Sequence, residues 1–234
     1  MPTEHISRAD LESPRSAKEY LAWVETTIRR LGGTDEGKSA IRLRCGLAKT
    51  LVEEALPLAI FSRKHYKASR CVTIQHRVGN QNFDAEVIDR RIRKSPFKYL
   101  EVTQAHDGEN EHYRMIALER DGHVNALGAV KKSGTKHTGI TVDVANEARS
   151  HTCLHAEELK RIEAAICRKL TKKYPDETAL IVAFDDYIAI HSDEDLDSLR
   201  NFASQSLLSK IANFRWLAFV GWGKQGFLEF DLRK

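Results

Sequence analysis

The sequence predicts an α/β fold in which one mixed central sheet is flanked by helices, with a helical extension at the N-terminus. Residues 178–184 form an almost uninterrupted apolar run, as expected of a buried central strand. Residues 155–174 repeat Leu and Ile at three- and four-residue steps against a polar face, which is typical of an amphipathic helix. Three short strand-like segments precede that helix. The resulting order is helix, three strands, helix, strand, helix and two strands, which favours an α/β arrangement.

The N-terminal part of the chain has helical patterns. Apolar residues recur at helical spacing from Ser16 to Leu31. A second helical region runs from 37 to 66, where Pro57 predicts a kink or a break. We therefore divide the chain into a tail and helical extension, residues 1–48, and an α/β core, residues 49–234.

The predicted strands of the core are short. The turn residues Gly79 and Asn80 join the first two as a hairpin. Residues 128–135 contain Gly, Lys and Ser, but their lysines precede the second glycine, so we expect a solvated basic loop and not a phosphate-binding loop. A second amphipathic helix is predicted over 193–213. The expected strands are 71–78, 82–88, 98–103, 113–118, 140–144, 178–184, 216–221 and 227–232.

Composition limits the functional classes. The 234 residues are 41% hydrophobic and carry a formal net charge of +4, which permits nucleic-acid binding without requiring it. No apolar run approaches the roughly 20 residues that span a bilayer, so we expect a cytoplasmic protein without membrane contact. The four cysteines show no CxxC or zinc-like spacing and are expected to be reduced structural thiols.

Two acidic strand segments are the strongest functional signal. Residues two apart in a strand share a face, so Asp84 and Glu86 project together, as do Glu101 and Thr103. Pairing of the two strands would bring Asp84 and Glu101 close enough to share a divalent metal.

This element order and carboxylate placement resemble the PD-(D/E)XK nuclease superfamily, which has the restriction-endonuclease-like fold. The resemblance covers 50–234. It implies that Asp84 and Glu101 are catalytic metal ligands, that Glu54 on the preceding helix is an auxiliary metal ligand, and that the metal is Mg2+ or Mn2+. The Pro that precedes the family's Asp is absent, because Phe83 stands there.

The family's lysine is also missing from its expected place. Thr103 occupies that position in the predicted catalytic strand, which removes a positive charge from the place where negative charge develops. We expect a lysine from elsewhere to replace it. Lys160 on the long helix is our candidate. Lys131 and Lys132 of the basic loop are further candidates. Lys98 is less favoured, because it would lie on the opposite face of its strand.

The densest basic run lies between the two acidic strands. Arg90, Arg91, Arg93 and Lys94 could contact phosphates and hold a nucleic acid over a metal centre. An exposed turn with ordinary solvated charges is equally consistent with this composition. The expected partner is nucleic acid, with DNA favoured, and a homodimer would suit cleavage of both duplex strands.

Other chemistries have weaker support. The histidines that crowd the middle of the chain form no HExxH motif, so a zinc hydrolase is disfavoured. Asp185 and Asp186 end the apolar strand, where acidic residues are commonly turn residues. Two hypotheses remain. The chain is a metal-dependent nuclease or nuclease-like DNA-processing enzyme, or it is a catalytically inactive nuclease-fold protein that binds nucleic acid or a protein partner.

Overall fold

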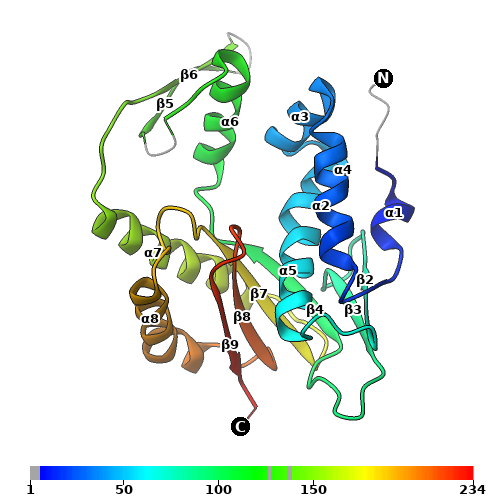
Figure 1. Ribbon diagram of the computed structural model, residues 1–234. Helices are drawn as coiled ribbons and strands as arrows, with labels where there is room; N and C mark the ends of the chain where they lie inside the picture. The colour runs from blue at the N-terminus through cyan, green and yellow to red at the C-terminus, as the bar shows by residue number, and fades with distance from the viewer. Residues whose placement is uncertain (1–5, 126–127, 136–138, 234) are drawn as a thin grey trace.

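A seven-stranded sheet forms the centre of the computed structural model, which describes residues 6–125, 128–135 and 139–233. Helices cover both of its faces (Figure 1). The strand order is β1-β2-β3-β4-β7-β8-β9. The strands are β1 (Arg15–Ser16), β2 (Val72–His76), β3 (Ala85–Asp89), β4 (Tyr99–Gln104), β7 (Thr178–Phe184), β8 (Trp216–Gly221) and β9 (Phe227–Asp231). The predicted α/β class with a mixed sheet is confirmed.

The sheet combines a meander with parallel crossovers. Strands β1 to β4 pair antiparallel with their neighbours, and β9 pairs antiparallel with β8. The pairs β4–β7 and β7–β8 are parallel. All seven residues of β7 are buried, as its continuous apolar sequence predicts. The hairpin at Gly79 is confirmed, since β2 and β3 pair in register around it.

The N-terminal helices cover one face of the sheet. Their buried residues share a single hydrophobic cluster with that face, in which Val24 of the second helix accompanies Leu58 and Leu100. The division at residue 48 stays a prediction, although both sides of it contribute to this cluster. Pro57 lies in the first turn of its helix, directly after a π-helical turn. The elements are α1 (Arg8–Glu12), α2 (Tyr20–Leu31), α3 (Asp35–Arg42), α4 (Gly46–Thr50), η1 (Leu51–Ala55) and α5 (Leu56–His65).

The other face is covered by α7 (His151–Leu170) and α8 (Asp193–Phe202). Ile162 and Ile166 of α7 are buried against Leu180 and Val182 of β7, as the three- and four-residue spacing predicts. The predicted helix over 193–213 ends as a π-helical turn, η2 (Ala203–Leu207), and a 3-10 turn, η3 (Leu208–Lys210).

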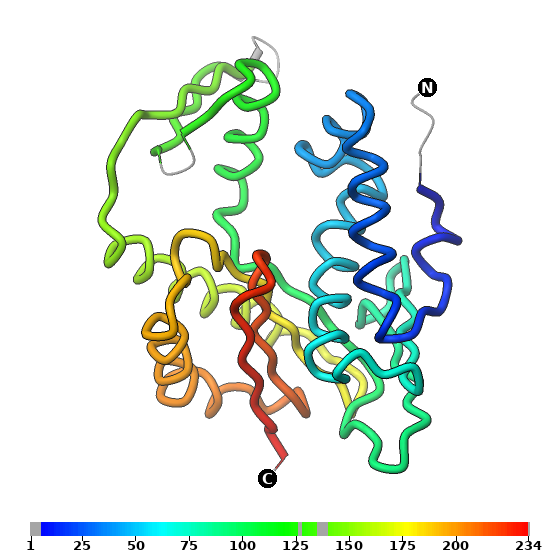
Figure 2. Tube along the Cα trace, in the orientation of Figure 1, coloured from blue at the N-terminus to red at the C-terminus, as the bar shows by residue number. Residues whose placement is uncertain are grey.

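An excursion between β4 and α7 differs from the prediction. Figure 2 follows it outward from the sheet and back. It contains α6 (Glu109–Asp121) and the hairpin of β5 (Val130–Thr135) and β6 (Gly139–Val144). The predicted strand over 113–118 is wrong, because Tyr113 and Ala117 are buried on one side of α6 at helical spacing. The predicted basic loop over 128–135 is wrong as well, since β5 pairs along its whole length.

Two further sequence predictions can be compared with the structure. None of the helices described here combines the length and apolar composition that a bilayer span requires. All four cysteines are free, in agreement with reduced thiols, but all are exposed, so they have no packing role in the core.

Candidate active site

Asp84 lies directly before β3, near Glu101 of β4. The Asp84 N–H donates to the Leu100 carbonyl at 2.8 Å, although Ala85 is the residue that pairs with Leu100, so the ladder is irregular at this point. After burial, the charge of Glu101 is the largest cause of the raised pKa of Asp84, so the two carboxylates are neighbours.

The Asp84 carboxylate replaces a backbone hydrogen-bond acceptor for Val102 of β4. Strand β3 begins at Ala85, so Val102 of β4 has no backbone acceptor on that side within the described residues. The Val102 N–H donates instead to Asp84 Oδ2 at 2.7 Å. Burial raises the pKa of the Asp84 carboxyl well above its usual range, and the negative charges of Glu101 and Glu54 raise it further.

A lysine and a tyrosine converge on Glu101. The Lys169 ammonium donates to Glu101 Oε1 at 2.5 Å, and the Tyr174 hydroxyl lies 3.4 Å from the same oxygen. The Glu101 side chain is 7% exposed and that of Lys169 is 19% exposed, so their interaction is only weakly screened by solvent. Burial, together with the charge of Glu101, raises the pKa of Tyr174. We name Asp84, Glu101, Lys169 and Tyr174 the acidic cluster.

Glu54, which belongs to the N-terminal helical region, lies near the acidic cluster. It lies in η1 and pairs with the buried His76 through a 3.0 Å contact between Glu54 Oε2 and His76 Nε2. Its charge is felt by Asp84, as the raised pKa of Asp84 indicates. Glu54 is thus close to the cluster, but it also has a structural partner in His76.

The remaining residues of the predicted catalytic motif have different surroundings. Thr103 is buried two residues after Glu101 in the same strand. Glu86 is paired with Arg77 at 3.0 Å and does not join the cluster by any contact within the described residues. Lys160 is on the exposed side of α7.

Lys169, which sequence reasoning did not single out, is the lysine that reaches the carboxylates. It lies in the last turn of α7, the helix that packs across β4 and β7. Lys98 and Lys132 pair with carboxylates outside the cluster, Lys98 with Glu177 at 2.6 Å and Lys132 with Glu109 at 2.9 Å. The sequence offered only a partial signal, because the C-terminal end of a crossover helix lies near the start of the next parallel strand. Which side of α7 faces β4 is set by packing.

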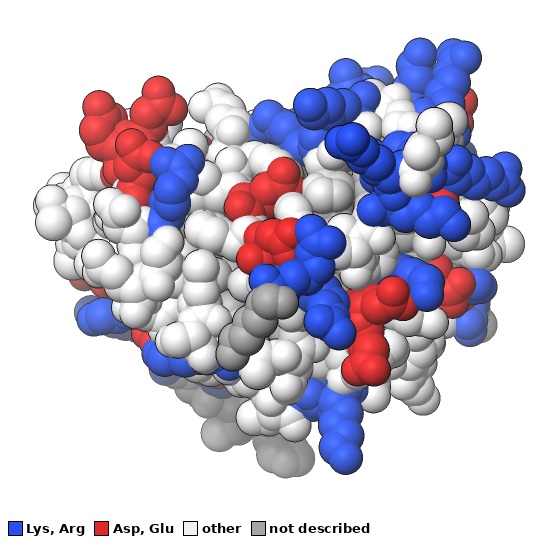
Figure 3. Space-filling model, turned by 90° about the horizontal axis from the view of Figure 1, so that it is seen from below, with Lys and Arg blue, Asp and Glu red and all other residues white. Residues whose placement is uncertain are grey.

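The basic run lies at the far end of β3. Strands rise about 3.3 Å per residue, which places Arg90 about 20 Å along the chain from Asp84. Arg91 is held by Asp89, which it contacts at 2.6 Å, whereas Arg90, Arg93 and Lys94 are exposed. Lys and Arg gather on one side of the molecule seen from below (Figure 3), the end at which this loop lies in Figure 1.

A pocket of about 880 Å³ opens at the carboxyl ends of the central strands, where α/β proteins commonly bind ligands. Its wall includes Glu53, Ala105 and Asp185. It has both signs of charge, and much of this charge is already paired: Arg161 donates to Glu158 at 2.7 Å. The residue after Asp185 is structural, because the Asp186 carboxylate accepts hydrogen bonds from backbone N–H groups of the β8–β9 turn.

The acidic cluster offers two carboxylates, an ammonium and a phenol within one partly buried site. Its oxygen-rich character suits a hard divalent cation. Comparison with known proteins gives no match to this chain from any family model, curated protein or solved structure.

Proposed function

We propose that this chain is a metal-dependent nuclease that hydrolyses phosphodiester bonds of nucleic acid at the acidic cluster. The observation that carries the proposal is the meeting of two carboxylates from neighbouring segments with a lysine from α7. Asp84, directly before β3, lies near enough to Glu101 of β4 for the charge of Glu101 to act on it, and Lys169 contacts Glu101 at 2.5 Å. The charge that Thr103 fails to supply is thus present, from another element.

The residues fit Mg2+ or Mn2+. Both ions prefer carboxylate and water oxygens. Burial raises the pKa of Asp84 most, and the charges of Glu101 and Glu54, which repel an ionised Asp84, raise it further. A bound dication would relieve the repulsion, would activate a water molecule and would neutralise charge on the scissile phosphate.

The other groups of the cluster have separate roles. Glu101 holds the Lys169 ammonium in place, so that its remaining N–H groups can donate to a phosphate oxygen. The Val102 N–H fixes the Asp84 carboxylate through Oδ2. Tyr174 keeps its proton, because its pKa is raised, and can donate from Oη.

The architecture supports the same proposal. A helix precedes the β2–β3–β4 meander, and α7 then leads to β7, which pairs parallel with β4. This is the order implied by the restriction-endonuclease-like fold, and we propose that the core adopts that fold.

Metal binding is the first test. Mn2+ and Mg2+ are titrated calorimetrically into the wild type, Asp84→Asn and the matched control Glu86→Gln. Glu86 lies two residues further along the chain, in β3, and pairs with Arg77. We expect saturable binding in the wild type and the control, and a loss of at least tenfold in affinity in Asp84→Asn. Equal affinity in all three proteins would contradict the proposed ligand.

Cleavage is the second test. The same proteins, with Lys169→Met and the control Lys160→Met, are incubated with single- and double-stranded DNA and RNA in Mg2+ or Mn2+. Loss of Lys169 should lower the cleavage rate on the order of a hundredfold, while Lys160→Met should leave it unchanged. Nucleic-acid binding by the wild type without metal binding or cleavage would favour the inactive binding module.

A further inference from the structure

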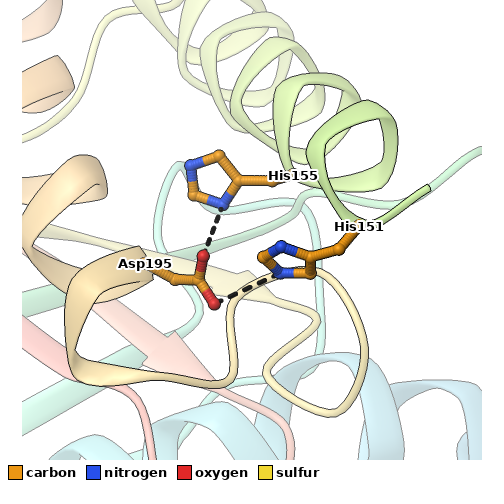
Figure 4. Close-up of side chains that lie close together, drawn as sticks. All are labelled: His151, His155 and Asp195. Carbon is orange, nitrogen blue, oxygen red and sulfur yellow. Dashed lines mark ion pairs between the residues drawn. The ribbon is translucent and has the colours of Figure 1, made fainter.

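A second group of possible ligands lies at the opposite end of α7 from Lys169. His151 and His155 are one helical turn apart at the start of α7, and both point toward Asp195 in the first turn of α8 (Figure 4). One ligand atom from each of the three residues can be chosen so that all lie within 4.8 Å of one another. The helix and its neighbour thus present imidazole and carboxylate groups to a common point.

The distances suit a small dication. His151 Nε2 is 3.3 Å from Asp195 Oδ2, and His155 Nδ1 is 3.4 Å from Asp195 Oδ1. Zinc binds nitrogen and oxygen at about 2.0–2.1 Å in a tetrahedral arrangement, which separates neighbouring ligand atoms by about 3.4 Å. Each contact is near that spacing, but the two contacts use different oxygens of the Asp195 carboxylate. With one atom from each residue the separations reach up to 4.8 Å, so small side-chain rotations are needed to bring all three onto one ion.

A third histidine adjoins the group. His191 Nδ1 lies 3.6 Å from Asp195 Oδ2, and the rings of His191 and His151 are 4.8 Å apart. His191 Nδ1 also lies 3.2 Å from the Ile188 carbonyl oxygen, so His191 borders the group and is not one of its ligands. The imidazoles of His151 and His155, with the Asp195 carboxylate, make a nitrogen-rich donor set. Imidazole suits zinc better than Mg2+, which prefers oxygen.

The surroundings can fix the orientation of the ligands. His155 Nδ1 lies 3.1 Å from the Ala189 carbonyl oxygen, and His155 Nε2 lies 3.0 Å from Ser198 Oγ. A metal bound at Nδ1 would replace the contact with Ala189 and leave the ring proton on Nε2, where Ser198 Oγ can accept it. Asp195 Oδ2 accepts the backbone N–H groups of His191 and Ser192 at 3.2 and 3.1 Å, which hold its carboxylate toward the group. The side chains of His151 and Asp195 are 45% and 10% exposed, so an ion can enter from solvent to a largely buried carboxylate.

We propose that His151, His155 and Asp195 form a zinc site that ties the start of α7 to the start of α8, with His191 beside it. The site is separate from the acidic cluster, which lies at the other end of α7 and contains no histidine within hydrogen-bond or ion-pair contact of Glu101 in the described structure. It therefore differs from the proposed nuclease centre in ligand chemistry as well as in position.

The test measures zinc alone on the full chain. The chelator-treated protein is titrated with Zn2+ by calorimetry, and the visible spectrum of the Co2+-loaded protein is recorded. The variants are His151→Ala, His155→Ala and Asp195→Asn. The controls are His123→Ala, an exposed histidine beyond the end of α6, and Asp84→Ala, which removes the proposed nuclease ligand.

We expect one zinc ion per chain at this site and an intense tetrahedral Co2+ spectrum. Each of the three variants should weaken zinc binding at least tenfold, and both controls should retain it. Absence of zinc binding, or unchanged affinity in His151→Ala and Asp195→Asn, would overturn the site and leave a hydrogen-bonded His–Asp cluster. Zinc binding lost only in Asp84→Ala would also overturn it, by placing the ion at the acidic cluster. Circular dichroism without metal checks the fold of each variant, and the wild-type Co2+ spectrum reads the ligand geometry independently of any substitution.

Discussion

Asp84 illustrates how a single residue can make a site responsive to metal. Its carboxylate is held by a backbone N–H, yet burial and two neighbouring carboxylates oppose its ionisation. Such a group destabilises the folded state whenever it is charged. A dication that neutralises it should therefore bind most strongly at a pH at which Asp84 is ionised.

The stability of Asp84→Asn should depend on pH in a defined direction. The pKa of Asp84 is raised in the folded state, so its contribution to the free energy of unfolding is fully present below the unfolded-state pKa of about 3.9. It is lost as pH rises through the folded-state pKa. The variant should thus gain stability relative to the wild type as pH rises, by up to about 1.4 kcal/mol per pH unit between the two pKa values.

Urea unfolding of both proteins at a series of pH values measures this difference. Saturating Mg2+ should reduce it at neutral pH, because the ion stabilises only the wild-type carboxylate. A difference that stays constant with pH would show that Asp84 has no raised pKa in the folded protein.

Asp186 is a residue whose importance is structural. It is buried, and its Oδ2 accepts the N–H groups of Gln225 and Gly226, each at 2.9 Å. Asp186→Ala would leave these donors unsatisfied, at a cost of about 3 kcal/mol in the free energy of unfolding. Chemical denaturation checks this value. Asp185→Ala is the control, and it should cost much less because Asp185 is only partly buried. Equal losses in the two variants would contradict the structural role of Asp186.

At the scale of elements, α7 connects the two proposed sites. Its last turn carries Lys169, its first turns carry His151 and His155, and between them Glu158 accepts the backbone N–H of Asp185 at 3.0 Å. The helix is amphipathic in the ordinary way, but its polar residues contact the strand ends and α8 as well as solvent.

The start of α7 depends on its N-cap. Ser150 accepts a hydrogen bond from the Cys153 N–H, so Ser150→Ala should lower the free energy of unfolding by about 1 kcal/mol. Thermal and urea unfolding measure this loss. Ser204→Ala offers a comparison, because the Ser204 hydroxyl of η2 donates to the Arg200 carbonyl of α8 and caps no helix start. An N-cap variant as stable as this comparison would contradict the expected contribution.

The elements were predictable from sequence where burial is strong and periodic. Strand β7 was predicted at both ends because every residue in it is apolar or buried, and α7 because its apolar face repeats regularly. The segment around Tyr113 was not, because few of its residues are buried and the helical spacing of Tyr113 and Ala117 spans only one turn. Such a segment takes its structure from its packing against β5 and β6.

The candidate site was also only partly predictable from the sequence. The closeness of Asp84 and Glu101 was predicted from the pairing of their segments, but the predicted strand over 82–88 begins only at Ala85, so Asp84 precedes it. Lys169 could not be chosen over Lys160 from the sequence, because the choice depends on which side of α7 faces β4. The i, i+4 spacing of His151 and His155 was visible, but Asp195 lies forty residues further on and is brought to them only by the packing of α8 against α7.

For the whole molecule, the charge distribution predicts how a nucleic acid should bind. The exposed basic loop lies about 20 Å along the chain from Asp84, so it can contact backbone beyond the phosphate that is cleaved. Replacing Arg90, Arg93 and Lys94 by Ala should weaken duplex binding and reduce the slope of log K against log salt concentration by up to about 3. Fluorescence anisotropy at several salt concentrations measures the slope.

The matched control removes three cations elsewhere on the surface, at Lys18, Arg29 and Lys38. This control changes the net charge by the same amount as the loop variant. Because its three cations lie outside the basic loop, the salt slope should stay nearly unchanged. If both triple variants reduce the slope alike, general charge attraction and not the loop accounts for binding.

The two edge strands of the sheet, β1 and β9, limit how two copies of the chain could pair. Strand β1 has only two residues, whereas β9 has five and pairs only with β8 among the described residues. A homodimer formed by joining two sheets edge to edge would therefore have to use β9. Antiparallel pairing about its middle residue would set Glu229 of one copy against Glu229 of the other, and like charges at facing positions are destabilising. The outer strand thus discourages the lateral growth that an open edge would otherwise allow.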